Sequence, residues 1–302
     1  MQLEEIISKL ENNYGKLPRE ALERAIEEKE AITPLLLDIL SNCKNNLEEI
    51  SNKPDYILHI CAFYLLAQFR EPLAYPIIID FFSIPGDMPV DATGDLLGGG
   101  LAKILASVCY RNIEPIKQLI ENQEVNEWVR ASALDSLIIL VVQEIISRQE
   151  IIEYYKELFS NLFANKYNAP QVKEEPDYIW THLVMNSSMF APVELQQYIE
   201  RTFDEDLIQP LYFERQEFND LLEIASEATL NALPNDIFYT LVEDAISEIK
   251  SEVFWISPFQ QTRNTLTKVE GFSNSPNKSK TKVKNKKKMQ QESRRKNRSK
   301  KK

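Results

Sequence analysis

Two histidines are the side chains in this sequence best suited to acid–base or metal chemistry, and each follows a copy of one tetrapeptide. Pro-Asp-Tyr-Ile at residues 54–57 recurs at 176–179, and His59 and His182 come shortly after the two copies. A general base needs a nucleophile within reach, and a metal ion needs several ligands. Cys61, two residues beyond His59, would point to another side of a helix. We therefore expect both histidines to lie in the core or to close helix ends.

An acidic, glycine-rich segment at residues 85–100 is the second candidate. It holds five of the seven glycines, together with Asp87, Asp91 and Asp95. These carboxylates could bind a cation or a partner, and the Gly-Gly-Gly at 98–100 would leave N–H groups free for an anion. The spacing matches neither a phosphate-binding P-loop nor an EF-hand calcium loop. We expect a long loop between helical repeats, with a ligand or partner contact through Asp91 and Asp95 as the alternative.

Three arginines and one tryptophan are candidates for holding another molecule. Arg70, Arg130 and Arg148 would form a ladder of arginine–acid pairs that joins successive repeats. Alternatively, they would line a concave face and grip a carboxylate or phosphate of a partner. Trp255 would cap the open face of the last repeat, or else serve as an exposed anchor for another protein.

The three cysteines, Cys43, Cys61 and Cys109, include no Cys-x-x-Cys pair. They therefore predict neither a disulfide framework nor a zinc site, and no cofactor or metal is expected. Cys61 and Cys109 lie in apolar helical stretches, where a thiol is buried and unreactive. Cys43 lies among polar residues, and we expect it to be more exposed.

Basic residues are concentrated at the C-terminal end. Residues 273–302 hold 14 of the 35 basic residues and one of the 46 acidic ones, so their net charge is +13 and the remainder carries −24. This segment lacks aromatic residues and cannot bury enough apolar surface to order itself, so we expect it to be disordered. Contact with RNA or the ribosome would be independent of base sequence. The alternatives are a solubilising tail, fold-back onto the acidic remainder, or an anionic membrane surface. The cations expected to meet phosphates are Lys286, Lys287, Lys288, Arg294, Arg295, Lys296 and Arg298.

Elsewhere, apolar residues recur at helical spacing, which predicts an all-α chain. Seven glycines are too few for the turns of a β-sandwich or barrel. Prolines mark the expected helix starts; Thr33-Pro34, for example, predicts an N-cap and first helical position. The stripe from Ile237 to Ile249 predicts one further helix. Repeated segments separated by multiples of about 40 residues are typical of HEAT and armadillo proteins. We predict a HEAT-like α-solenoid of about six helix pairs at 1–256, a linker at 257–276 and a disordered tail at 277–302.

Several segments resemble the bacterial domain-of-unknown-function family 1186 over about residues 1–250. The resemblance implies a helical-repeat fold and no established activity. Some relatives end in a cysteine-rich zinc motif of the SEC-C kind, but this chain has no cysteine after Cys109. The family pattern also has a Thr-Glu-Asp-like run where this chain has Gly-Gly-Gly at 98–100. The matching segments are LPREA (17–21), ITPLL (32–36), FYLLAQFRE (63–71), AYP (74–76), FFSIPG (81–86) and ILASVC (104–109).

These features favour a non-enzymatic interaction scaffold whose concave face binds a protein or peptide. The first alternative is a nucleic-acid- or ribosome-associated factor tethered by the basic tail. A weaker alternative is a helical-repeat enzyme or lyase acting through His59, Asp91 and Asp95. No secretory signal and no apolar stretch of membrane-spanning length are seen, so we expect a cytoplasmic protein.

Overall fold

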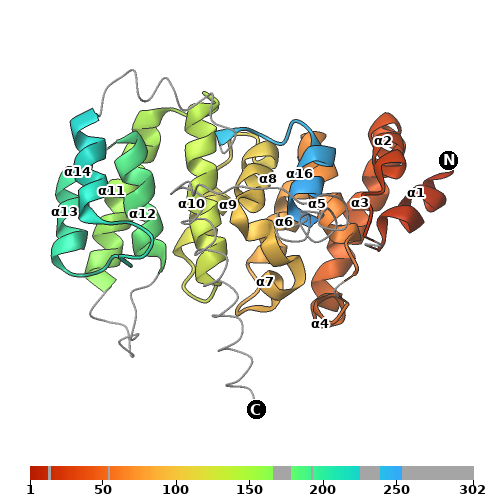
Figure 1. The fold of residues 1–302 in the computed structure, drawn as a ribbon, viewed down its shortest axis with the longest axis horizontal. Helices are drawn as coiled ribbons and strands as arrows, with labels where there is room; N and C mark the ends of the chain where they lie inside the picture. The colour runs from red at the N-terminus through yellow and green to blue at the C-terminus, as the bar shows by residue number, and fades with distance from the viewer. Residues whose placement is uncertain (13–14, 54, 166–177, 192, 225–238, 254–302) are drawn as a thin grey trace, which may run out of the picture. The chain divides into compact units, whose positions relative to one another are not determined.

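The protein is represented by a computed structural model, which describes residues 1–253 apart from 13–14, 54, 166–177, 192 and 225–238 (Figure 1). In these ranges all regular structure is helical, and pairing of the β type is limited to two isolated bridges. The all-α prediction is therefore confirmed for the described part of the chain. The chain divides into Met1–Trp255 and Ile256–Lys302, and the second unit lies outside the described residues. The expected domain boundary after residue 256 stays a prediction.

The helices are α1 (Leu3–Leu10), α2 (Arg19–Glu27), α3 (Lys29–Cys43), α4 (Leu47–Ser51), α5 (Leu58–Gln68), α6 (Ala74–Phe82), α7 (Met88–Thr93), α8 (Gly100–Val108), α9 (Glu114–Glu121), α10 (Glu127–Val142), α11 (Arg148–Asn165), α12 (Tyr178–Phe190), α13 (Gln196–Asp204), α14 (Arg215–Ile224) and α16 (Ala245–Val253). Two short 3-10 helices, η1 (Lys44–Asn46) and η2 (Gly94–Gly98), follow α3 and α7.

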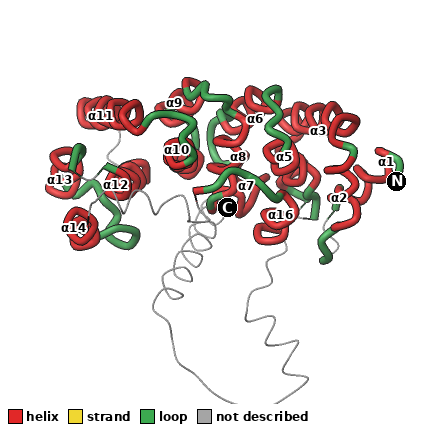
Figure 2. The backbone as a smooth tube through the Cα atoms, turned by 90° about the horizontal axis from the view of Figure 1, so that it is seen from above, coloured by secondary structure: helices red, strands yellow, loops and turns green. Residues whose placement is uncertain are grey.

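Most of the longer helices lie in two rows (Figures 1 and 2). One row contains α3, α6, α9 and α11, and the second, called here the α5 row, contains α5, α8, α10 and α12. Each member of the α5 row packs against the next, and α3 and α6 pack against α5. The chain therefore alternates between the rows over much of its length. The last described helix breaks this order, because α16 returns to pack on α5 and α2.

Burial follows from this arrangement. Ten of the eleven residues of α5 are buried, because α3, α8 and α16 cover different sides of it. A helix surrounded in this way gains from apolar residues around its whole circumference, which explains why α5 lacks a polar face. By contrast, α9 buries Ile116, Leu119 and Ile120 on one side and keeps charged residues on the other. Helix α5 is thus a central helix of the core, with other helices packed around it.

Three helix ends share a left-handed backbone residue that is not glycine. Arg70, Glu144 and Asp206 have φ angles of 56°, 57° and 54° after α5, α10 and α13. At each end two N–H groups turn back to the last carbonyls of the helix; Arg70 and Glu71, for example, bond to Ala67 and Leu66 at 3.0 Å. This is the Schellman arrangement, in which glycine is the usual residue. Arginine, glutamate and aspartate therefore hold a conformation that costs about 1 kcal/mol.

Two expectations about helix bounds are wrong. Helix α3 begins at Lys29, so Pro34 lies inside it rather than at its first position. Residues 85–100 are not a plain loop, because α7 and η2 form there. Pro89 occupies the first turn of α7, where its missing N–H costs nothing, and the Thr93 hydroxyl donates to the Pro89 carbonyl at 2.7 Å.

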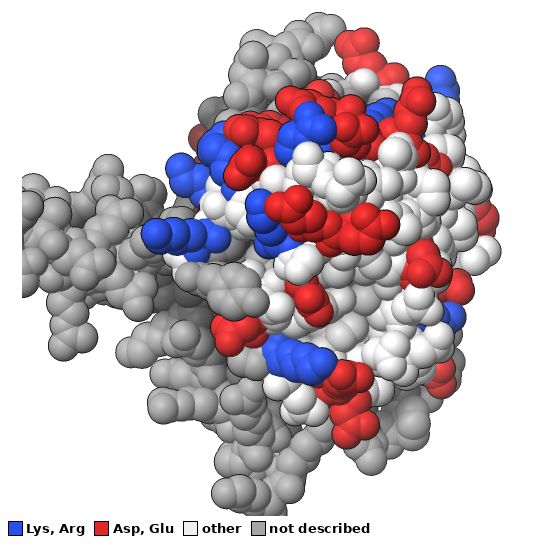
Figure 3. All heavy atoms as spheres, turned by 90° about the vertical axis from the view of Figure 1, so that its right-hand side faces the viewer, with Lys and Arg blue, Asp and Glu red and all other residues white. Residues whose placement is uncertain are grey.

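Charged residues at the N-terminal end form local pairs. Figure 3 shows acidic and basic side chains intermixed on this end of the molecule. Several of these side chains form ion pairs with a residue four positions away, about one helical turn, as in Lys9–Glu5, Arg19–Glu23 and Lys53–Glu49. Such exposed pairs are screened by water and salt, so they contribute little to the stability of this end.

Candidate functional site

The C-terminal described segment, residues 239–253, crosses the face of the α5 row that points away from α3 (Figure 2). We call this segment the strap. It consists of residues 239–244, which lie outside any α-helix, followed by α16, and α16 begins where Asp244 supplies a cap. The Asp244 carboxylate accepts hydrogen bonds from the Ile246 and Ser247 N–H groups at 3.0 and 3.1 Å. Together with the Ser247 hydroxyl, these bonds lower the pKa of Asp244. Ile237 and Phe238 lie outside the described residues, and within 239–253 the α-helix that the apolar stripe predicts begins only at Ala245.

Side chains of the α5 row bind the strap through its backbone. Gln143, just after α10, donates to the Tyr239 carbonyl at 2.8 Å. The Ser107 hydroxyl of α8 accepts a hydrogen bond from the Val242 N–H at 2.9 Å and donates one to the Lys103 carbonyl. Gln68 of α5 accepts from the Ala245 N–H at 2.8 Å. Backbone groups just before α16 and at its first residue are thus satisfied by side chains of the row.

Arg70, just after α5, contacts the strap through its side chain. Its guanidinium donates to the Val242 carbonyl at 2.7 Å and to the Ala67 carbonyl at 2.6 Å, and it also pairs with Glu243. The planar guanidinium can serve several acceptors in this way because its donors point in fixed directions. Sequence reasoning identified this arginine but not its partner, because the strap lies far away in the sequence.

Apolar side chains and a second ion pair complete the site. Val242, Ala245 and Ile249 are each 0% exposed. Lys103 of α8 lies 2.7 Å from Glu248 of α16, and these side chains are 12% and 20% exposed. Both ends of the strap are thus anchored against the row. The sequence analysis singled out neither Lys103 nor Glu248. The feature that could have indicated Lys103 is its position as a charged residue in the otherwise apolar helix α8.

The other two candidate arginines lie apart from the strap. Arg130, 2% exposed on α10, donates to the Ile120 carbonyl at the end of α9 at 2.7 Å. Arg148 donates to the Phe190 carbonyl at 2.9 Å and pairs with Glu194 at 2.6 Å, which lowers the pKa of Glu194. Both cations therefore bind carbonyls near the end of another helix, where acceptors lack partners within their own helix.

The acidic candidates form no metal site among the side chains that the structure describes. Asp91 is exposed on α7, and the side chain of Asp95 lies outside what the structure describes. No group of three or more His, Cys, Asp or Glu side chains in the described residues could hold a metal ion. Gly100, at the start of α8, has a packing role instead, since a Cβ there would lie 2.1 Å from the Tyr64 hydroxyl oxygen.

The two histidines differ in their partners. His59 is 1% exposed and donates from Nε2 to the Ala92 carbonyl at 2.8 Å, tying α5 to α7. Burial lowers the pKa of His59 to about 4, because the charged imidazolium would lose its hydration. His182 of α12 lies 3.2 Å from Asp135 of α10, which also accepts from Asn186 at 3.0 Å. Each histidine therefore joins neighbouring helices.

All three cysteines are buried, contrary to the expectation for Cys43, which is 4% exposed at the end of α3. Burial raises the pKa of Cys43 to about 11 and that of Cys61 to about 12, and it also raises the pKa of Cys109. A thiol with a raised pKa is a poor nucleophile at neutral pH.

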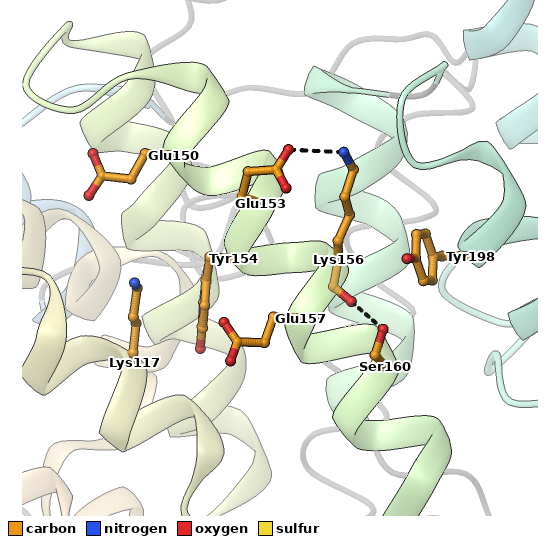
Figure 4. A pocket seen from close by; sticks show the side chains of 8 residues that line it. All are labelled: Lys117, Glu150, Glu153, Tyr154, Lys156, Glu157, Ser160 and Tyr198. Carbon is orange, nitrogen blue, oxygen red and sulfur yellow. Dashed lines mark hydrogen bonds and ion pairs between the residues drawn. The ribbon is translucent and has the colours of Figure 1, made fainter.

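A shallow hollow of about 500 Å³ lies between α9, α11 and α13 (Figure 4). Glu153 and Lys156 form an ion pair at its edge, and Lys117 lies over the Tyr154 ring at 4.8 Å. The Ser160 hydroxyl donates to a backbone carbonyl at 2.7 Å rather than to a base. The hollow therefore shows mixed charge but no activated nucleophile, and none of the sequence candidates lines it.

The remaining candidates lie outside the described residues. They are Trp255, Lys286, Lys287, Lys288, Arg294, Arg295, Lys296 and Arg298. No helix of the described ranges is both long and apolar enough to cross a membrane.

Comparison with known proteins agrees with the resemblance seen in the sequence. The family model described as "Protein of unknown function (DUF1186)" matches residues 1–257. The chain belongs to this family. An uncharacterized protein of Chlamydia muridarum is 34% identical over 261 residues, which cover 86% of this chain and 98% of the relative. An uncharacterized protein of Chlamydia trachomatis serovar D is 33% identical over the same lengths. No solved structure matches the chain.

The family match also separates the two candidate regions. It includes the whole strap, which ends at Val253, and it stops before the basic segment at 273–302. The strap is therefore part of the family domain, whereas the basic segment lies beyond it.

Proposed function

We propose that this protein is a cytoplasmic, non-enzymatic scaffold that binds a polypeptide segment of a protein partner on the face of the α5 row. In this proposal the two rows of helices are a HEAT-like α-solenoid of about six pairs, and the face that carries the strap is its concave face. The alternation of the chain between the rows supports this interpretation. The binding role rests on the strap.

The observation that carries the proposal is the way in which the row holds the strap. Gln68, Arg70, Ser107 and Gln143 all bond to strap backbone groups, and these groups are present in any polypeptide. Surfaces that bind extended peptides use this same combination: hydrogen bonds to the main chain give affinity, and pockets for a few side chains give selectivity. The strap side chain that is buried at this position is Val242.

A synthetic peptide can test whether the face binds polypeptide in trans. Val242→Asp in the full chain places a carboxylate in the apolar site and releases the strap, and a labelled peptide of residues 239–253 is then added. We expect saturable binding by fluorescence anisotropy, weakened when Gln68→Ala and Ser107→Ala are added. Circular dichroism and faster hydrogen exchange of residues 239–253 confirm a folded chain with a released strap. Absence of binding to such a chain contradicts the proposal.

The basic segment favours a second function, association with RNA or the ribosome. Its 14 cations and single acid at 273–302 would release counterions from phosphates, so binding should weaken steeply with salt. Full-length protein should co-sediment with RNA at low salt, and deletion of residues 273–302 should abolish this. Unchanged co-sedimentation after the deletion contradicts this function and leaves the first one untouched.

A further inference from the structure

We infer that the α5 row recognises an acidic partner segment through Arg70 and Lys103, and that the strap is a built-in competitor for this site. This inference rests on the proposed function and adds the chemistry of the partner and the regulation of the site. The partner segment would carry two acidic residues five positions apart, as Glu243 and Glu248 are in the strap. An apolar residue would precede the first acid, as Val242 does.

Arg70 and Lys103 are basic residues in a part of the chain that is otherwise strongly acidic. Outside residues 273–302 acidic residues outnumber basic ones by 45 to 21, so a random surface would repel an acidic peptide. Arg70 at the end of α5 and Lys103 on α8 nevertheless both meet glutamates of the strap. Lys103 is 12% exposed, and weaker hydration around it strengthens its attraction for a carboxylate. The site is thus locally selective for acidic residues against the charge of the remaining chain.

The strap also shows which backbone shape the site accepts. Glu243 lies in the non-helical part, where Val242 is fixed through both its N–H and its carbonyl. Glu248 lies on α16, one turn after Asp244 caps the helix start. Ile246 and Ile249 of α16 are buried, and α16 packs mainly on α5. A partner that fits must therefore lack α-helix up to its first acid and then be helical, with one apolar helical face.

Competition follows because partner and strap use the same groups. The side-chain donors and acceptors of the row, on Gln143, Ser107 and Gln68, are already engaged by backbone groups of residues 239–245. A partner can bind only the fraction of molecules whose strap is released, so its apparent affinity falls in proportion to that fraction. The intact chain is therefore self-inhibited, and weakening the strap should increase binding without any change in the row.

Peptides of reversed charge separate this inference from the proposed function. The full chain with Val242→Asp is titrated with the native peptide 239–253 and with one carrying Glu243→Lys and Glu248→Lys. We expect binding about tenfold weaker for the lysine peptide, and the reverse preference when Arg70→Glu and Lys103→Glu are added to the protein. Equal binding of both peptides overturns the charge recognition but preserves the proposed function. Binding of neither peptide overturns both.

Two controls complete the design. The exchange Glu49→Lys with Lys53→Glu reverses an exposed pair outside the strap site, so it should leave both affinities unchanged. The chain without Val242→Asp should bind the native peptide at least about tenfold more weakly, because its own strap competes. Equal affinity of the intact and released chains overturns the competition. If Val242→Asp fails to fold, Ile249→Asp offers a second way to release the strap from a fully buried position.

Discussion

The α5 row and the strap that crosses it are stabilised in different ways. Within the row, buried aliphatic and aromatic side chains fill the contacts; Phe63, Leu65 and Leu66 of α5 are all 0% exposed. The strap buries fewer apolar residues and depends on hydrogen bonds from side chains to its backbone. Each such bond contributes about 1 kcal/mol, whereas a buried leucine or phenylalanine contributes about 2–3 kcal/mol.

This difference suggests an order of opening. Elements with few buried apolar contacts open with a smaller free energy than the rest of a domain. The strap should therefore leave the row before the row itself unfolds, which is the property that a displaceable competitor needs. Four predictions test this contrast, two in the core of the row and two in the strap.

The largest effect is expected from acid at His59. Its pKa is about 4 in the folded chain and about 6.5 in the unfolded chain, so the unfolded chain takes up the proton first as the pH falls. Stability should therefore be fully present above pH 6.5 and decline toward pH 4, by about 3 kcal/mol. Chemical denaturation measured across this range tests the loss.

His59→Gln provides the matched variant, because its amide can still donate to the Ala92 carbonyl but does not titrate. Its stability should depend less on pH between 4 and 6.5. Asp244 in the strap behaves differently, since its pKa is lowered below the ordinary value and the cap should be lost only in stronger acid. An unchanged pH slope in His59→Gln would show that another group causes the acid loss.

The second prediction concerns the contact between α8 and α5 at Gly100. A Cβ there would meet the Tyr64 hydroxyl, and Tyr64 is 0% exposed and has no room to move aside. Gly100→Ala should therefore cost about 2 kcal/mol, measured by urea denaturation. Gly98→Ala, where no atom lies within 4 Å of the added Cβ, is the control and should have little effect. Equal effects would remove the packing explanation.

Much of the fold was predictable because helical periodicity is a local property. The apolar stripes, the buried stretch around α5 and the family membership all follow from residues close together in the sequence. Helix bounds were less accurate: Pro34 is accommodated inside α3, and a capping aspartate delays α16 until Ala245. In both places one side chain or backbone contact overrides the hydrophobic pattern.

The site was predictable only in part, because its halves are far apart in the sequence. Arg70 was a candidate from its type and position, but its partners Val242 and Glu243 come more than 170 residues later. Lys103 and Ser107 belong to no sequence motif that predicts a contact with the strap. A serine whose hydroxyl accepts a hydrogen bond from a distant backbone N–H cannot be told from other helical serines in the sequence. Contacts of this kind are set by tertiary packing, which a local pattern does not encode.

The third prediction exchanges the charges of the partly buried pair between Lys103 and Glu248 of the strap. Lys103→Glu or Glu248→Lys alone places like charges together and should destabilise strap docking by about 1 kcal/mol. The double exchange should recover most of this loss, because the pair is restored with opposite polarity. Hydrogen exchange of residues 239–253 measures docking directly, and additivity of the two single changes would show that the groups do not interact.

The smallest and sharpest test compares two helix ends with the same backbone. Glu144 and Arg70 are both left-handed, but Glu144 is exposed whereas Arg70 binds the strap. Glu144→Gly relieves the backbone and should stabilise the protein by about 0.5 kcal/mol, after the entropy that glycine gains on unfolding is subtracted. Arg70→Gly gives the same relief but loses the contacts to Val242 and Glu243. It should therefore lower stability and speed exchange of the strap amides. If both variants gain stability equally, the contacts of Arg70 to Val242 and Glu243 do not hold the strap against the row.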